Sequence, residues 1–286
     1  MYLGKDNVLI LSVSRKTLLC KWFLRAARKF NTGILGTDIN KDAPALSILD
    51  GTVILPELKA QSFIEELLSA IKKNNIKLIV PTREEELLFL PAFLREIESQ
   101  GCAVLCNSLS VAKKMIDKAM FTRFCIEDLG YKNIRLVTSG TKVADKDFPL
   151  FFRGAGLRSN LKIKVKNRDE LKAAFALSPS GIATTYLKGD ELSVDCYVSK
   201  EGKIIYYVPR TRDVVLSGES IMTTTVDAPA CRDVLCKLVF KSRLIGPLVL
   251  QGVLQGSSFV PFEINLRFGG ASALSFKAAV SGAELA

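Results

Sequence analysis

Three polar residues alternate along a strand-like segment near the end of the 286-residue sequence, EINLRF, where Glu263, Asn265 and Arg267 occupy every second position. Side chains two residues apart in a strand point to the same face of a sheet. An apolar segment precedes this one, and the sequence QGS at 255–257 between them predicts a hairpin turn. With the turn centred on its serine, Gln251 and Glu263 are each six residues from the centre, so we expect them to lie opposite each other.

A carboxylate, two amide oxygens and a guanidinium on one sheet face make a poor hydrophobic core, because each polar group would need a partner if it were buried. The same set fits a site for magnesium and phosphate. Mg²⁺ prefers hard oxygen ligands, and arginine can neutralise charge on a phosphoryl group in transfer. The alternative is the solvent-facing side of a hairpin, and the spacing alone does not decide between the two.

The elements expected in residues 1–110 are those of a Rossmann-like domain. An apolar strand at 8–13 precedes an amphipathic helix between residues 18 and 30 and a second strand at 33–38, the opening of a parallel sheet covered by helices. Helices at 62–73 and 84–98 and strands at 77–81 and 102–106 continue the pattern. The first strand is followed by SVSRKT and not by a G-x-G-x-x-G loop, so a dinucleotide site would lack its glycines.

The composition shifts towards strands in the second part of the chain. After a helical stretch at 110–129, we predict strands at 148–154, 161–167, 189–199 and 203–212, with one short helix at 169–177. Strands grouped with few helices favour an α+β arrangement over further β-α-β units.

The composition also excludes several kinds of chemistry. The sequence has no histidine, which excludes Ser-His and Cys-His catalysis and leaves carboxylates, amides, Lys, Arg and bound ions. Its seven cysteines are an odd set without a Cys-x-x-Cys pair, which favours buried thiols in a reducing cytosol. The start of the chain lacks the features of a signal peptide, and no apolar run approaches the roughly 20 residues of a membrane span. We therefore expect a cytoplasmic protein without a membrane partner.

The net charge of +11 favours anionic partners. The stretch 153–168 holds six basic residues and no acid, and Lys162, Lys164 and Lys166 alternate with apolar residues, so their charge should face one side of a strand. A solvated face is the default explanation. ATP or an acidic substrate is the second, and nucleic acid is the third because aromatic residues for base stacking are missing.

The segment EINLRFGGA at 263–271 resembles the Glu-x-Asn-x-Arg-x-Gly-Gly strand of the ATP-grasp enzymes, particularly their carbamoyl-phosphate-synthase-like branch. The resemblance extends over nearly the whole chain. It includes APAL at 43–46, IVPTREEEL at 79–87, DKAMFTRF at 117–124, FPLFFRGAG at 148–156, YLKGDELSVD at 186–195, VPRTR at 208–212 and SGES at 217–220. Each segment alone is a weak signal, and it is their order and spacing that indicate the family.

The resemblance implies a role for each matching residue. Gln251, Glu263 and Asn265 match the family's magnesium positions, for which Mn²⁺ is an alternative ion, and Arg267 matches its phosphate-contacting arginine. The residues that match basic positions holding ATP phosphates are Lys118 and Arg153. The backbone of Leu187 matches the adenine contact, and Glu191 matches the acid that binds the ribose.

Two departures from the family pattern bear on the nucleotide site. The phosphate loop RGAGLRSN contains only two glycines, which limits the approach of backbone amides to phosphate. Thr184 and Thr185 stand where many members carry an acidic residue or a Gln-Glu pair. They motivate one alternative, a nucleotide-binding protein of this fold without turnover, and the net charge motivates another, a basic nucleic-acid-binding protein.

The resemblance implies an α/β and α+β protein, with a Rossmann-like pre-ATP-grasp domain at 1–110 and a two-lobed ATP-grasp domain at 111–286. Its lobes would be 111–185 and 186–286. The implied activity is a carboxylate-amine ligase that binds ATP and Mg²⁺, forms an acylphosphate and releases ADP and phosphate. Its partners would be a small carboxylate and an amine or other nucleophile, whose identities remain open, as do a homo-oligomeric state and whether the C-terminus is complete.

Overall fold

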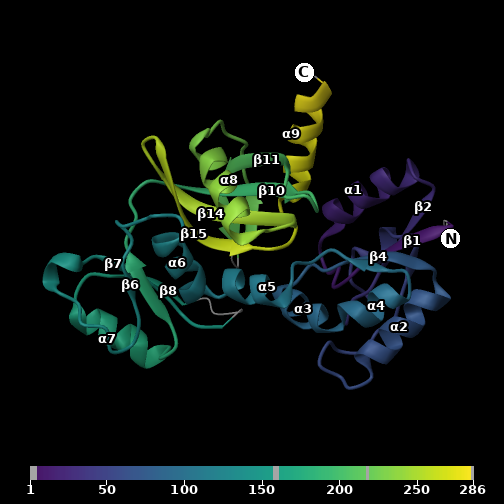
Figure 1. Ribbon diagram of the computed structural model, residues 1–286, viewed down its shortest axis with the longest axis horizontal. Coiled ribbons are helices and arrows are strands. Elements are labelled where there is room, and N and C mark those ends of the chain that lie inside the picture. The colour runs from purple at the N-terminus through teal and green to yellow at the C-terminus, as the bar shows by residue number, and fades with distance from the viewer. Residues whose placement is uncertain (1–4, 157–160, 217–218, 285–286) are drawn as a thin grey trace.

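The computed structural model describes residues 5–156, 161–216 and 219–284. Three sheets of four or five strands follow one another along the chain, and Figure 1 shows them side by side, with the N-terminal sheet at one end and the sheet of β6 to β9 at the other. The sheet that carries the predicted magnesium residues lies between them. The fold class is the predicted one, a parallel α/β unit followed by antiparallel α+β units.

The N-terminal sheet is parallel and has the strand order β3-β2-β1-β4-β5. Its strands are β1 Asp6–Ile10, β2 Thr32–Gly36, β3 Gly51–Thr52, β4 Ile76–Val80 and β5 Ala103–Val104. Helix α1, Thr17–Arg28, packs on one face, and the other face is covered by α2, Phe63–Lys73, and α4, Leu94–Ser99. The strand order reverses between β1 and β4, so their carboxyl ends form the crevice where ligands bind in sheets of this kind.

The predicted helix at 84–98 is interrupted. It consists of α3, Glu84–Phe89, a 3₁₀ turn at Leu90–Phe93, and α4. Pro91 lies at the start of the 3₁₀ turn, where its missing N–H ends the regular helical hydrogen bonding.

The second sheet is antiparallel, with the order β6-β9-β7-β8. It comprises β6 Leu136–Val137, β7 Leu150–Arg153, β8 Lys162–Val165 and β9 Ile182–Thr185, of which we did not predict β6 and β9. Helix α7, Arg168–Leu177, packs on the face that carries Phe152 and Val165. Lys162 and Lys164 lie on the opposite face, as their alternation predicts, and pair there with Arg153 and Phe151.

The third sheet has the order β11-β10-β14-β15 and is also antiparallel. Its strands are β10 Asp190–Val198, β11 Ile204–Thr211, β14 Gly246–Gln255 and β15 Ser258–Asn265. A small hairpin of β12, Val214–Leu216, and β13, Glu219–Met222, follows β11 in the chain. Helix α8, Ala230–Ser242, packs on the apolar face of the sheet, and α9, Ser272–Glu284, follows β15.

The predicted helix at 110–129 is two helices, α5, Leu109–Ile116, and α6, Lys118–Glu127. Asp117 separates them because its backbone is extended, and its carboxylate caps α6 by accepting a bond of 2.8 Å from the Met120 amide. Both helices contribute to the core beneath β14 and β15, through residues such as Met115 and Phe124. The start of α6 is thereby held close to the strand that carries Glu263.

The described part of the chain contains no helix long and apolar enough to cross a membrane. All seven cysteines are free, as we expected, and five of them are buried. Burial raises the pKa of Cys125 and Cys196 to about 12, so these thiols are protonated at neutral pH.

An aromatic cluster joins the N-terminal sheet to the third sheet. Phe268, three residues after β15, packs edge-on against Phe23 of α1 at 5.5 Å between ring centroids and belongs to the core under α1. Its ring also contacts Phe276 of α9 at 5.4 Å and stacks with Tyr197 of β10 at 6.4 Å. The segment after the predicted magnesium strand is therefore built into the domain junction.

Candidate functional site

The β14–β15 hairpin brings Gln251 and Glu263 directly opposite each other, as predicted, but the physical reason differs from the one we assumed. The turn is tight, because Gln255 pairs directly with Ser258. If the register between the turn and Val253 continued unchanged along the strands, Gln251 would lie opposite Phe262. A bulge on β15 adds one residue and moves the pairing to Glu263.

Gly252 stands at the point where the register shifts. A Cβ atom at this position would lie 2.5 Å from Cζ of Phe259 and 2.6 Å from the carbonyl oxygen of Val260. A larger residue would push the two strands apart beside the bulge, so this position requires glycine.

The predicted magnesium residues face the same side of the hairpin. Glu263 and Gln251 are partly buried, and Asn265, the last residue of β15, is 6% exposed and pairs with Val249. The Oε2 atom of Glu263 is buried and has no hydrogen-bond partner among the described residues. An unpaired buried carboxylate oxygen is costly, and a bound cation would compensate it.

A metal site here would depend on amides as well as on one acid. Within the described ranges, no three His, Cys, Asp or Glu side chains form a group that could hold a metal ion. One carboxylate and two amide oxygens still fit Mg²⁺, which typically takes its remaining ligands from water and from substrate phosphates.

Arg153, at the end of β7, reaches across to the hairpin. Its Nη1 donates a bond of 2.6 Å to the carbonyl oxygen of Phe262, the residue added by the bulge. The side chain is 2% exposed, and its Nε and Nη2 atoms have no hydrogen-bond partner in the described structure. Burial lowers the pKa of the Arg153 guanidinium, while the carboxylate of Glu263 raises it. The two unused donors and this nearby charge suit an anion bound together with a cation.

Arg267 lies in the bend between β15 and α9. Its Nη1 donates to the carbonyl oxygen of Phe268 at 3.2 Å, and its Nε is buried without a hydrogen-bond partner among the described residues. Our prediction that Arg267 shares the strand face of Glu263 and Asn265 is wrong, because β15 ends at Asn265 and the chain bends there; Arg267 follows Asn265 by two residues.

Lys118 begins α6 and lines a cavity of about 380 Å³ together with Arg153, Gly154, Ala155 and Gly156. We call this the Lys118 cavity. The lysine Nζ donates to the carbonyl oxygen of Gly156 at 3.5 Å. The structure therefore brings together both basic residues that we predicted to hold phosphates and the first part of the phosphate loop. The rest of this loop, 157–160, including Arg158, lies outside the described residues.

Glu84 is a residue of this region that our sequence reasoning missed. It begins α3, after β4, and burial raises the pKa of its carboxyl, while Arg267 and Lys118 lower it and Glu263 raises it. These charges act on Glu84 because the N-terminal part of the chain meets β15 and α6 at this point. The signal in the sequence was three consecutive acids that begin four residues after the end of a strand.

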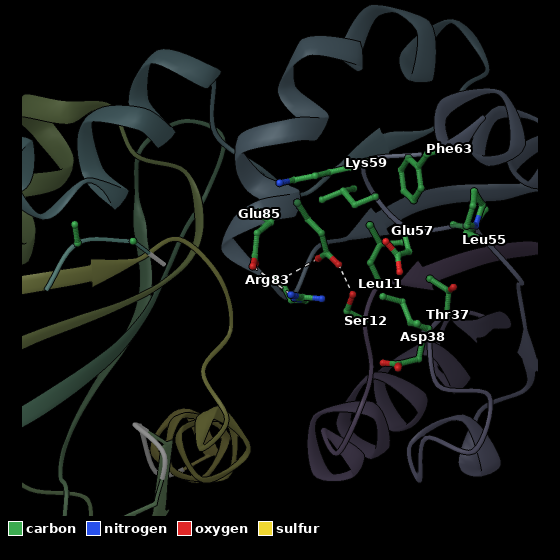
Figure 2. Close-up of a pocket in the computed structure, with 16 residues that line it drawn as sticks. Leu11, Ser12, Thr37, Asp38, Leu55, Glu57, Lys59, Phe63, Arg83 and Glu85 are labelled. Atoms are coloured by element: carbon green, nitrogen blue, oxygen red, sulfur yellow. Dashed lines mark hydrogen bonds and ion pairs between the residues drawn. The ribbon is translucent and has the colours of Figure 1, made fainter. Parts of the chain in front are cut away.

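A second cavity of about 630 Å³ lies at the carboxyl ends of β1, β2 and β4, the crevice of the parallel sheet. We call it the N-terminal cavity, and Figure 2 shows its lining side chains. Its polar residues are Ser12, Thr37, Asp38, Glu57, Lys59, Arg83, Glu85 and Glu86. Ala155 and Gly156 line it as well, so the phosphate loop borders both cavities.

Glu86 shapes the wall of the N-terminal cavity. Its carboxylate accepts bonds from the amides of Thr82 and Arg83 at 2.7 and 3.0 Å, and from the hydroxyl of Ser12 at 2.5 Å, the last drawn as a dashed line in Figure 2. Burial raises the pKa of the Glu86 carboxyl, and the hydrogen bonds from Ser12, Thr82 and Arg83 lower it. Arg83 also pairs with Glu85 at 3.2 Å.

The two residues predicted to hold the nucleoside, Glu191 and Leu187, both contact other side chains of the protein. Glu191, on β10, pairs at 3.0 Å with Arg212, the residue directly after β11. Leu187 lies between β9 and β10, half-buried against the core of the third sheet. Thr185, one of the departures from the family pattern, accepts a bond of 2.9 Å from the Arg135 amide, which ties β9 to β6.

Two family models match the sequence. Residues 8–105 match the PylC-like N-terminal domain, and residues 178–286 match a domain described as ATP-grasp in the biosynthetic pathway with Ter operon. A comparison with curated proteins found no match.

The fold resembles solved structures whose sequences differ strongly from this one. A biotin carboxylase from Campylobacter jejuni, in complex with β,γ-ATP, has a TM-score of 0.70 at 14% identity, and the match covers 94% of this chain and 67% of that one. An L-amino acid ligase from Bacillus licheniformis has a TM-score of 0.69 at 14% identity, with 96% and 70% covered.

A third structure carries magnesium and nucleotide in its name. It is the biotin carboxylase domain of a 2-oxoglutarate carboxylase from Hydrogenobacter thermophilus, in complex with MgADP, ADP and bicarbonate. Its TM-score is 0.67 at 14% identity, and the match covers 95% of this chain and 66% of that one. Residues 178–286 therefore belong to an ATP-grasp family, residues 8–105 match the PylC-like N-terminal domain, and the chain shares the fold of these solved structures.

Proposed function

We propose that the protein is an ATP-dependent ligase that phosphorylates a carboxylate and passes the resulting acylphosphate to an amine or another nucleophile. The observation that carries the proposal is the unsatisfied polar cluster around β15. Glu263, Arg153 and Arg267 each keep at least one buried polar atom without a hydrogen-bond partner among the described residues. A carboxylate beside two guanidinium groups, all with unused bonding capacity, fits a cation together with phosphate groups.

Each predicted residue receives a role in this proposal. Glu263, Asn265 and Gln251 would hold Mg²⁺, with Mn²⁺ as an alternative, and the ion would neutralise charge on the phosphates of ATP. Arg267 would stabilise charge on the γ-phosphoryl group, and Arg153 and Lys118 would hold phosphate oxygens. The backbone of Leu187 would contact adenine, and Glu191 would bind the ribose in competition with its ion pair to Arg212.

The reaction needs two steps. A carboxylate oxygen of the acceptor attacks the γ-phosphorus, and the bond from that phosphorus to the bridging oxygen of ADP breaks. The nucleophile then attacks the acyl carbon, phosphate leaves, and the nucleophile loses its proton. The enzyme contributes position and charge neutralisation, without a covalent intermediate of its own.

The acceptor would occupy the N-terminal cavity. This cavity shares Ala155 and Gly156 with the Lys118 cavity, so a molecule bound there can present a carboxylate to the phosphate loop. The polar lining carries both signs of charge, as expected for a small polar acceptor.

The proposal is tested by incubating the protein with Mg-ATP and a panel of carboxylic acids and amines. ADP release that depends on both is the expected result. With an ¹⁸O-labelled carboxylic acid, one ¹⁸O atom should move into inorganic phosphate, because the acylphosphate breaks at the acyl carbon. Release of AMP would contradict the acylphosphate route, and binding of Mg-ATP without turnover across the panel would favour the non-catalytic alternative.

We also propose the domain limits 1–110, 111–185 and 186–286, and a cytoplasmic location. The free state of all seven cysteines supports a reducing compartment. The limit between 185 and 186 falls between β9 and β10, and the limit between 110 and 111 falls in the first turn of α5, after the last strand of the N-terminal sheet.

A further inference from the structure

A buried ionic network lies at the base of the segment that carries Arg267. Asp195, on β10, and Arg210, on β11, form an ion pair of 2.6 Å in which both side chains are almost fully buried. Two serines of α9 donate to the same carboxylate: Ser272 to Oδ1, and Ser275 to Oδ2 at 3.0 Å. None of these residues belongs to the set that we predicted from the sequence.

Ser272 connects this network to the backbone that follows Arg267. The Gly269 amide donates to the Ser272 hydroxyl at 2.7 Å, while the Ser272 hydroxyl donates to Asp195. Gly269 is two residues after Arg267 and four after Asn265. The bond from Asp195 through Ser272 to Gly269 therefore fixes a point of the chain close to the proposed phosphate and metal ligands.

The segment between β15 and α9 needs such a tether because it lacks regular secondary structure. Residues 266–267 form a bend and 270–271 a turn, with irregular backbone between them, so the segment is held by individual bonds and by packing. Phe268 anchors one side of this segment in the aromatic cluster under α1. The link from Gly269 to Asp195 anchors the other side, through groups that are buried.

We propose that Asp195 is a positioning residue for phosphoryl transfer, which acts through Ser272 and the Gly269 amide to hold Arg267 in place. This inference rests on the proposed function of Arg267. A guanidinium that stabilises a transferring phosphoryl group must be placed before the reaction begins, and a small misplacement lowers the rate strongly. The buried pair with Arg210 keeps the Asp195 carboxylate oriented.

The two serines provide a matched pair of variants. Both hydroxyls are almost fully buried, both donate to Asp195, and the residues are one helical turn apart on α9. Of the two, Ser272 is the one that also accepts the Gly269 amide. Ser272→Ala therefore breaks the tether, whereas Ser275→Ala removes a comparable bond and leaves the tether intact.

The first measurement is the affinity for Mg-ADP with and without aluminium fluoride, which mimics the transferring phosphoryl group and requires no acceptor. Ser272→Ala should weaken binding of the mimic by about 10- to 100-fold while changing the Mg-ADP affinity by less than about threefold. Ser275→Ala should change both affinities by less than about threefold, although it lowers the melting temperature. Equal losses of the mimic in the two variants would overturn the proposal.

The second measurement is a double-mutant cycle with Arg267→Ala. If Ser272 acts through Arg267, Ser272→Ala in the Arg267→Ala background should weaken binding of the mimic by less than about twofold further. If instead the two substitutions weaken binding of the mimic independently, so that their fold-changes multiply, the proposal is overturned. If Ser272→Ala does not fold, the isosteric pair Ser272→Thr and Ser272→Val makes the same comparison, with the hydroxyl kept or removed.

The third measurement is hydrogen exchange of the Gly269 amide in the protein without nucleotide. It should become faster in Ser272→Ala and stay unchanged in Ser275→Ala. This readout does not depend on ATP chemistry. A wild-type protein that binds neither Mg-ADP nor its aluminium fluoride complex would refute the proposed function, whereas an unchanged Gly269 exchange rate in Ser272→Ala would refute the tether alone.

Discussion

The guanidinium of Arg153 donates a hydrogen bond of 2.6 Å to the carbonyl oxygen of Phe262, the one residue that the β-bulge adds to β15. A bulge leaves its extra residue outside the regular ladder, and here a residue 109 positions earlier in the chain satisfies the free carbonyl. The same bulge sets Glu263 opposite Gln251. One interaction thus connects the second sheet, the register of the hairpin and the proposed metal site.

Arg153→Met should separate stability from nucleotide binding. The substitution removes a buried charge whose burial is unfavourable, but it also leaves the Phe262 carbonyl without its donor, so we expect unfolding free energy to change by no more than about 2 kcal/mol. Affinity for Mg-ATP should fall by about 10- to 100-fold, since charge-assisted bonds to phosphate are lost. Urea unfolding and calorimetric titration check the two values. Arg123→Met, on the exposed face of α6, should change neither, and an unaltered ATP affinity in Arg153→Met would contradict its assignment.

Glu263→Gln should keep the fold and raise the magnesium concentration needed for ATP binding and turnover. Glutamine has nearly the same shape but lacks the charge that pairs with the ion, so we expect the apparent Mg²⁺ affinity to fall at least about tenfold. Titration of Mg²⁺ at fixed ATP measures the change. Glu127→Gln on α6 is the matched control, and an unchanged Mg²⁺ titration in Glu263→Gln would remove Glu263 from the metal site.

Gly252→Ala should disturb the metal site through the backbone. The added Cβ would meet Phe259 and the Val260 carbonyl at about the position of the register shift, and overpacking of this kind costs about 1–3 kcal/mol. We expect reduced stability together with weaker Mg-dependent ATP binding, because the pairing of Gln251 with Glu263 depends on this shift. Gly202→Ala, in a turn with open space around it, should lower stability by the strain of its positive φ and leave ATP binding intact. Normal Mg²⁺ dependence in Gly252→Ala would show that the bulge does not set the site.

Glu86→Gln should alter the pH dependence of stability. Burial raises the pKa of the Glu86 carboxyl in the folded protein above its ordinary value of 4.5, so the folded state favours the protonated form. The protonated carboxyl therefore contributes to the free energy of unfolding below pH 4.5, and this contribution is lost as the pH rises through the pKa of Glu86 in the folded protein. Glutamine does not ionise, so the variant does not lose this contribution as the pH rises. The melting temperature of the variant minus that of the wild type should therefore increase from about pH 4.5 towards neutral pH. Glu98→Gln, on the exposed side of α4, should show no such trend, and a difference that falls with pH would contradict the direction of the shift.

The sequence predicts most of the fold because short-range patterns determine the elements. Period-two and helical spacing locate β1, α1, β2, α2 and the strands of the hairpin within a few residues of their observed limits. The misses have local causes. Pro91 divides the helix at 84–98, Asp117 caps a second helix inside 110–129, and β9 has too short a run of apolar residues to stand out.

The candidate site was predictable where its residues share one strand. Glu263 and Asn265 share β15 and were found by alternation, which also indicated Arg267 although it lies beyond the end of the strand, and the family resemblance added Arg153 and Lys118. Glu84, Asp195 and Ser272 were missed, because each is brought to this region by contacts with segments that are distant in the sequence. Ser272 and Asp195, for example, are separated by 77 positions.

The sequence by itself determined the fold class, the superfamily resemblance and the polar face of the last strand, because these depend on residue types and spacing within short segments. Tertiary structure alone decided the bulge that aligns Gln251 with Glu263, the contact of Arg153 with that bulge, and the network from Asp195 to Gly269. These features depend on which strands and helices become neighbours, and that is settled by packing of the whole chain. The magnesium face can therefore be predicted from eleven letters, 257–267, together with Gln251, but the groups that hold it in place cannot.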